Sequence, residues 1–143
     1  MRPIPEPSQL DTIERTTPGA LASKYEFVGR HMMASYVGCD SQALRDFDRL
    51  EDAMRQAVQA SGATLLTSAR HVFPPHGLTI VMLLSESHAS IHTYPEHNSC
   101  FVDLFTCGLE CQAEEFDAVM RSYLRPAKSS VTAWIRHSGI QRD

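Results

Sequence analysis

The sequence predicts an α+β fold, a two-layer sandwich in which helices cover one face of a mainly antiparallel sheet. Two observations predict it. Short segments with the composition and alternation of strands occur along most of the chain, and two segments repeat their apolar residues at helical spacing. These segments follow one another in the order strand, helix, several strands, helix, strand, which is typical of helices packed on one side of a sheet.

Bulk properties limit the class of protein. The 143 residues predict one domain with an ordinary globular composition, 43% apolar and 21% charged. A net charge of −4 argues against nucleic-acid binding. The chain has no apolar run of about 18 residues and no signal-like N-terminus, so we expect a cytoplasmic protein without a membrane segment. The four cysteines have no metal-binding spacing, and no metal site is expected.

The N-terminal part divides into a tail and the start of the domain. Residues 1–24 carry four prolines and no hydrophobic period, which predicts a flexible tail before a single domain over residues 25–143. Tyr25 to Val37 is rich in aromatic and aliphatic residues and stops at Gly38, which favours a strand.

A helix is the clearest local prediction. Asp40 or Ser41 offers an N-cap, and Gly62 stands where a glycine ends a helix. Between them the apolar residues recur every three or four positions and define one buried face: Leu44, Phe47, Leu50, Met54 and Val58.

The middle of the chain predicts strands joined by turns. Thr64 to Phe73 is followed by a proline-glycine turn and then by Leu78 to Leu84. The nearly unbroken apolar run of this second segment suggests burial on both faces or a central place in the sheet. Two further extended segments are interrupted by residues 95–99, namely Ala89 to Tyr94 and Cys100 to Cys107.

A second helix and a last strand complete the domain. Gln112 to Leu124 places Phe116, Val119, Met120 and Tyr123 on one face, and Arg125-Pro126 ends it. Ser130 to His137 alternates apolar and polar residues, which predicts a strand with two different faces.

The stretch with most chemistry follows the apolar run directly. It reads Ser-Glu-Ser-His-Ala-Ser-Ile-His-Thr-Tyr-Pro-Glu over residues 85–96, and Phe-Thr-Cys-Gly follows at 105–108. Together these segments resemble the signature of the short prokaryotic S-adenosylmethionine decarboxylases, which form their own pyruvoyl cofactor by cutting the chain before the motif serine. The resemblance runs in recognisable pieces from about Val28 to Cys107.

This resemblance implies a role for each motif residue. Ser87 would attack the carbonyl of Glu86, the chain would be cut between them, and the serine would become the pyruvoyl group that forms a Schiff base with the substrate. His92 would move the proton during processing, with Thr79 as helper, and Cys107 would donate the proton in catalysis. Residues five apart point to opposite faces of a regular strand, so Ser87 must lie in a bend to meet His92.

The substrate side of the motif matches less completely. Phe73 matches the aromatic residue that stacks on adenine, and Glu96 matches a carboxylate near the ribose. Tyr94 stands where the family commonly has Trp, and the loop after Glu96 also differs. The resemblance therefore implies S-adenosylmethionine, decarboxylated to supply spermidine synthesis, while arginine or ornithine stays open as a substrate.

The resemblance also implies a homodimer of processed two-chain protomers with sites at the interface.

The same residues allow other interpretations. A non-catalytic regulatory homologue would be expected to have lost Ser87, His92 or Cys107, and all three are present. A metal cluster could instead be read from four residues, but their spacing supports it poorly: His88, His92, His97 and Cys100.

Overall fold

The computed structural model describes residues 25–108 and 110–137. The predicted flexible tail, residues 1–24, lies outside the described residues. In chain order the elements are β1 (Tyr25–Val37), α1 (Ser41–Arg45), α2 (Phe47–Ala60), β2 (Leu65–Phe73), β3 (Gly77–Leu84), β4 (Ser87–Tyr94), the 3₁₀ turn η3 (Pro95–His97), β5 (Ser99–Gly108), α3 (Ala113–Leu124) and β6 (Lys128–Arg136).

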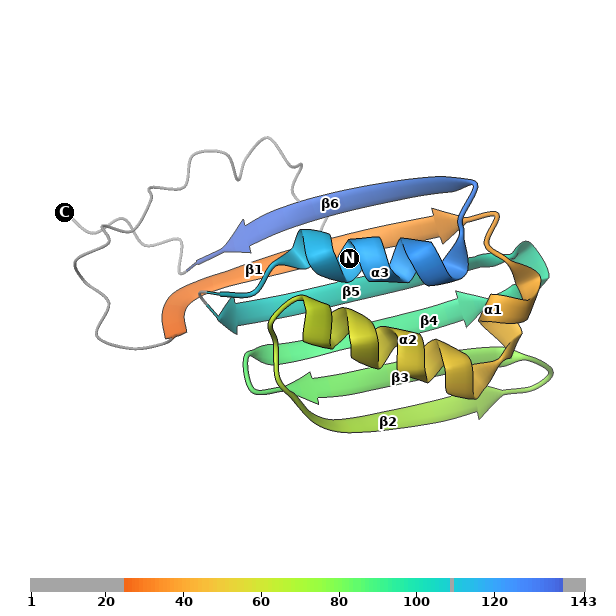
Figure 1. Cartoon of the computed structure of the whole chain (residues 1–143), viewed down its shortest axis with the longest axis horizontal. Coiled ribbons are helices and arrows are strands. Elements are labelled where there is room, and N and C mark those ends of the chain that lie inside the picture. Colours follow the sequence, from red (N-terminus) through yellow and green to blue (C-terminus); the bar gives the residue numbers. More distant parts are fainter. Residues whose placement is uncertain (1–24, 109, 138–143) are drawn as a thin grey trace, which may run out of the picture.

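The strands form one six-stranded sheet in the order β2-β3-β4-β5-β1-β6, and every neighbouring pair is antiparallel. The helices all lie on one face of the sheet (Figure 1). This arrangement confirms the predicted α+β two-layer sandwich. Among the described residues, none of the helices has the length and apolarity that crossing a membrane requires.

The first helical segment is broken where one continuous helix was predicted. Asp46 has an extended backbone, with φ −85° and ψ 90°, and its carboxylate accepts a hydrogen bond from the backbone N–H of Arg49 at 3.2 Å. Asp40 caps α1 in the same way, through the N–H of Ala43 at 3.0 Å. The short side chain of Asp46 therefore starts a new helix, because it offers the backbone a partner outside the helical ladder.

The core lies between the helices and the covered face of the sheet. Alternate residues of each inner strand point into it, as the period of two requires. The largest side chains that are completely enclosed there come from both layers: Tyr36, Leu44, Leu50, Met54, Leu78, Ile80, Met82, Ile91, Phe116, Met120 and Leu124.

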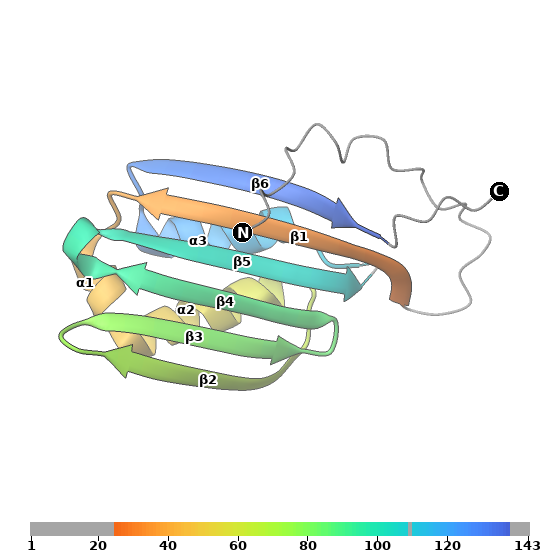
Figure 2. The same cartoon turned by 180° about the vertical axis from the view of Figure 1, so that it is seen from behind.

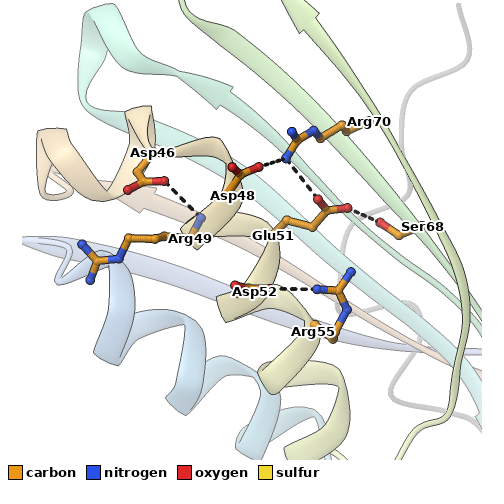
Figure 3. Close-up of polar contacts among 8 residues, drawn as sticks. All are labelled: Asp46, Asp48, Arg49, Glu51, Asp52, Arg55, Ser68 and Arg70. Carbon is orange, nitrogen blue, oxygen red and sulfur yellow. Dashed lines mark hydrogen bonds and ion pairs between the residues drawn. The ribbon is translucent and has the colours of Figure 1, made fainter.

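The edge strand β2 is tied to α2 by a small polar network (Figure 3). The guanidinium of Arg70 lies 2.8 Å from the Asp48 carboxylate and 3.1 Å from that of Glu51. Ser68 donates a hydrogen bond to Glu51 at 2.7 Å. These contacts hold the edge strand against the helix layer, where few apolar side chains are available.

None of the described residues, 25–108 and 110–137, forms a layer over the second face of the sheet (Figure 2). In β3, Val81 and Leu83 point to this face and are 45% and 50% exposed, while their neighbours point into the core. The apolar run of β3 is therefore not buried on both faces of one protomer, although the strand is internal to the sheet. Several large apolar side chains share this second face: Met33, Val37, Phe73, Val81, Leu83 and Phe101.

Candidate functional site

The hairpin between β3 and β4 contains an unusual backbone conformation at Ser87. This residue is the first of β4 and has φ 151°. Residues other than glycine seldom adopt this region, and holding one there costs about 1–3 kcal/mol. The strain falls on the residue that the sequence predicted to be the nucleophile, directly after the peptide bond predicted to be cut.

The carbonyl of that peptide bond has two donors, both from one residue. The oxygen of Glu86 accepts a hydrogen bond from the backbone N–H of Cys107 at 2.9 Å. It also accepts from the Cys107 thiol at 3.1 Å. Donors aimed at a carbonyl oxygen stabilise the negative charge that develops there when a nucleophile attacks the carbon.

The side chain of Glu86 is buried and held by hydrogen bonds. It is 3% exposed, and its carboxylate accepts from the backbone N–H of Thr64 at 2.8 Å and from the Ser85 hydroxyl at 2.6 Å. Gly108 makes room for it, because a Cβ at that position would lie 2.7 Å from the Glu86 Cγ. Burial, together with the Glu86 carboxylate, raises the pKa of the nearby Cys111 thiol, which therefore stays protonated.

The imidazole nearest to the Ser87 hydroxyl belongs to His88, with 3.0 Å between Ser87 Oγ and His88 Nδ1. Sequence reasoning did not give His88 a catalytic role. Strand alternation assigns neighbouring residues to opposite faces, and only the positive φ of Ser87 brings the two side chains together. Residues 84–89 contain neither proline nor glycine that would signal this backbone conformation.

A second cluster lies where β4 ends. The Thr79 hydroxyl is 2.5 Å from His92 Nδ1. The ring of Phe73 packs edge-on against His92 at a centroid distance of 5.8 Å, and Tyr94 packs against it at 4.7 Å. The structure thus groups three residues that the sequence singled out, Phe73, Thr79 and Tyr94, around the imidazole of His92.

Two further residues extend this cluster. Glu96, predicted to bind ribose, lies exposed in η3, two residues after Tyr94 in the chain. Phe101, which the sequence did not single out, packs against Tyr94 at 5.3 Å and is 54% exposed. Its position opposite His92 in the β4–β5 register was the only available signal, and this register could not be assigned from one sequence.

The two clusters lie at opposite ends of β4. Ser87 begins the strand and His92 is five residues further on, which corresponds to about 16 Å at the usual rise of a strand. In Figures 1 and 2 the β3–β4 hairpin is at one end of the sheet and the β4–β5 connection at the other. The bend at Ser87 that the sequence predicted is present, but it does not bring Ser87 to His92 within one protomer.

Comparisons with known proteins identify a family to which the chain is similar. A model of the family described as S-adenosylmethionine decarboxylase matches residues 30–137. The chain is 42% identical over 104 residues to an S-adenosylmethionine decarboxylase proenzyme of Methanococcus maripaludis, covering 73% of this chain and 85% of the relative. A proenzyme of the same description from Thermosipho africanus is 36% identical over 109 residues, 76% of this chain and 84% of the relative.

A solved structure is similar over nearly its whole length. The crystal structure of the adenosylmethionine decarboxylase from Aquifex aeolicus superposes with a TM-score of 0.69 at 30% sequence identity. The alignment covers 85% of this chain and 97% of that chain. Similarity in sequence and in fold therefore extends across both clusters.

Proposed function

The chain belongs to the S-adenosylmethionine decarboxylase family, and on this basis we propose that its pyruvoyl group forms from Ser87 when the Glu86–Ser87 bond is cut. The protein is a self-processing carboxy-lyase that acts on S-adenosylmethionine and serves spermidine synthesis. The relatives reported above are named for S-adenosylmethionine and not for arginine or ornithine, the substrates that the sequence left open.

The contact between Cys107 and the Glu86 carbonyl carries the proposal. The Ser87 hydroxyl attacks the carbonyl carbon of Glu86, the two Cys107 donors stabilise the oxyanion, and the peptide nitrogen leaves as the amine of an ester. A base then removes the α-proton of Ser87, and the carboxylate of Glu86 departs. The dehydroalanine that remains takes up water and releases ammonia to leave a pyruvoyl group.

The residues around Ser87 fit a pyruvoyl group at this position. The bond lies in a hairpin turn, so that cutting it leaves the β4 ladder on both sides intact, with Ser87 as the first residue of the strand. The group supplies a carbonyl that accepts the electrons released with CO₂. Cys107, whose thiol donates to the Glu86 carbonyl next to Ser87, would return a proton to the substrate carbon.

The base for processing comes from a second copy of the chain in this proposal. His92 is hydrogen-bonded to Thr79 and lies about 16 Å along β4 from Ser87 in its own protomer. A homodimer that places the His92 end of one sheet over the Ser87 end of the other brings the clusters together twice. The chain that supplies His92 would then also supply the substrate-binding residues. Phe73 and Tyr94 would offer the stacking surface, and Glu96 the ribose acceptor.

His88 is the competing base, because it already contacts the Ser87 hydroxyl. In that case processing would need one protomer only. The two assignments of the base, His92 of the partner or His88 of the same chain, predict different complementation between variants in a mixed dimer. This difference can be measured.

The first experiment tests the cut itself. The wild-type protein should give two fragments on denaturing gels, residues 1–86 and residues 87–143, and the second should have a blocked, borohydride-sensitive N-terminus. Ser87→Ala should stay at full length. A wild-type chain of full-length mass with a free Ser87 after prolonged incubation would contradict the proposal.

The second experiment tests the origin of the base. Ser87→Ala and His92→Ala chains are co-expressed with different tags. A mixed dimer contains one complete site, formed by Ser87 of one chain and His92 of the other, so the His92→Ala chain should be cut. If His88 of the same chain were the base, His92→Ala would be cut without help and His88→Ala would not be cut at all.

A further inference from the structure

We propose that Phe105 is a positioning residue for the first stage of processing, in which the Ser87 hydroxyl attacks the Glu86 carbonyl. Its ring holds the imidazole of His88 at the Ser87 hydroxyl, and this imidazole takes up the hydroxyl proton. The inference rests on the proposed function, because it needs a cut between Glu86 and Ser87. It assigns a base to the hydroxyl proton, which is distinct from the α-proton removed in the second stage.

Phe105 is the cross-strand neighbour of His88. The two residues pair in the β4–β5 register, and their ring centroids are 5.6 Å apart. On its other side, His88 Nδ1 lies 3.0 Å from Ser87 Oγ. His88 is only partly buried, so a neighbouring ring is needed to keep its imidazole in one orientation. A base must stay within hydrogen-bond reach of the proton that it takes up.

Gly29 of β1 makes the space for the Phe105 ring. A Cβ at this position would lie 2.4 Å from Cε2 and 2.5 Å from Cζ of the ring. Gly29 lacks the positive φ of Gly38 and Gly62, so its backbone conformation does not require a glycine. Phe105 is partly exposed, and the space therefore does not serve packing of the core. The lack of a side chain at position 29 instead allows this ring its place.

Two further side chains hold the Phe105 ring. The Arg136 guanidinium lies over it, with its Cζ 4.9 Å from the ring centroid, an arrangement in which a cation is attracted to the ring face. His31 packs edge-on at a centroid distance of 5.5 Å. The ring of His31 is itself oriented by Asp103, whose carboxylate lies 2.9 Å from its Nε2. Phe105 is thus held from β1 and β6 while it contacts His88 on β4.

The imidazole of His88 returns the proton that it takes up. As Ser87 Oγ forms its bond to the carbonyl carbon of Glu86, the hydroxyl proton passes to Nδ1 of His88. When the C–N bond breaks, the same proton passes from Nδ1 to the leaving nitrogen. The products are an ester and the amine of Ser87, and no proton is gained or lost. One imidazole therefore acts first as general base and then as general acid.

Phe105→Leu tests the positioning role. Chains are pulse-labelled in cell-free synthesis and incubated with hydroxylamine, which cuts the ester as it forms, so that loss of full-length chain reports the first stage. Phe105→Leu should lower this rate about tenfold, less than the hundredfold or more expected for His88→Ala. Ile135→Ala is the control, because Ile135 is an exposed apolar residue that precedes Arg136 on the other face of β6. Its rate should equal that of the wild type.

Gly29→Ala displaces the ring without removing it. It should slow the first stage in the wild-type chain, because the added Cβ and the Phe105 ring cannot occupy the same space. In a Phe105→Leu chain it should change the rate less than about twofold, since the ring is already gone. Equal slowing by Gly29→Ala in both backgrounds would show that position 29 does not act through Phe105, and would overturn the proposed arrangement.

A second cycle separates positioning from a general effect on the sheet. If Phe105 acts through His88, Phe105→Leu should slow the wild-type chain about tenfold and the His88→Ala chain less than about twofold. A tenfold loss in both backgrounds would assign Phe105 to the stability of the sheet and refute the positioning role. A His88→Ala chain that forms the ester at the wild-type rate would refute it as well.

Failure of this inference can be told from failure of the proposed function. A wild-type chain that keeps its full length and a free Ser87 would contradict both. A wild-type chain that is cut, together with a Phe105→Leu chain cut at the same rate in hydroxylamine, would overturn the role of Phe105 alone.

Discussion

The carbonyl oxygen of Glu86 lies 2.9 Å from the backbone nitrogen and 3.1 Å from the sulfur of Cys107. One residue therefore touches the bond proposed to be cut through both its main chain and its side chain. Sequence reasoning gave Cys107 a role in turnover only. The contact adds a role in processing, and the two roles can be separated by substitution.

Cys107→Ala should slow processing without abolishing it, because the backbone N–H remains in place. A thiol is a weak donor, and loss of a strong donor of this kind costs about a hundredfold or more. The delay should therefore be smaller than about a hundredfold, as followed by the disappearance of full-length chain over time. Cys107→Ser, which keeps a donor, should process faster than Cys107→Ala.

Turnover by the processed Cys107→Ala enzyme should decline during the assay. Without the thiol, protonation at the pyruvoyl carbon followed by hydrolysis would release the decarboxylated substrate as an aldehyde and leave an amine in place of the cofactor carbonyl. Release of CO₂ should stop while substrate remains. Steady turnover at the wild-type rate would show that another group donates the proton.

Thr79→Val should slow processing at its second stage, because His92 loses the hydroxyl that lies 2.5 Å from its Nδ1. The imidazole would then be free to rotate or to change tautomer, and proton removal from Ser87 would suffer. The ester should accumulate and be cleaved by hydroxylamine. Thr79→Ser keeps the hydroxyl and should behave as wild type; equal rates for Thr79→Val and wild type would exclude this role.

Phe73→Ala should reduce kcat/KM for S-adenosylmethionine. The ring packs against His71 and His92 and Phe73 is still 42% exposed, so part of its surface is available for stacking on a purine. The loss of an aromatic pair, about 0.5–1.5 kcal/mol, corresponds to roughly two- to tenfold. Val72→Ala, on the other face of β2, is the matched control and should leave kcat/KM unchanged.

Tyr36→Phe should lower the free energy of unfolding by about 1.5–3 kcal/mol, the usual range for a hydrogen bond to a charged group. The Tyr36 hydroxyl is completely buried and donates to the Asp117 carboxylate, which also pairs with Arg121 at 2.8 Å. Urea denaturation of the unprocessed Ser87→Ala chain measures the change. Tyr123→Phe removes a bond to the neutral carbonyl of Ala43 and should cost less; a larger loss for Tyr123→Phe would contradict this account.

Local patterns in the sequence were sufficient for most of the fold. The alternation in β6, the periodicity of α3 and the turn before Gly77 depend on neighbouring residues, and each was predicted within a few positions. The break at Asp46 was missed because its apolar neighbours keep one helical period across it. The preference of this one aspartate for a helix-capping position breaks the helix, although the apolar periodicity continues through the whole segment.

The site was harder to predict because its geometry depends on pairing between strands. The motif residues were identified, but their distribution over two ends of β4 follows from the hairpin register and from the backbone of Ser87. A sequence pattern shows which residues a site contains. It does not show whether residues five apart on one strand serve the same site or two sites in a symmetric pair.

The position of the proposed cut also determines whether the enzyme can refold after it unfolds. A single polypeptide that unfolds can find its own strands again, whereas cleavage in the β3–β4 hairpin leaves two central strands on separate molecules. Their reassembly would be a second-order event that slows with dilution, and the unpaired β3 strand would present an apolar edge to other chains. The half-life of the processed enzyme would thus be set by its rate of unfolding rather than by its equilibrium free energy of unfolding. Thermal inactivation should therefore be irreversible in the processed protein and more nearly reversible in Ser87→Ala.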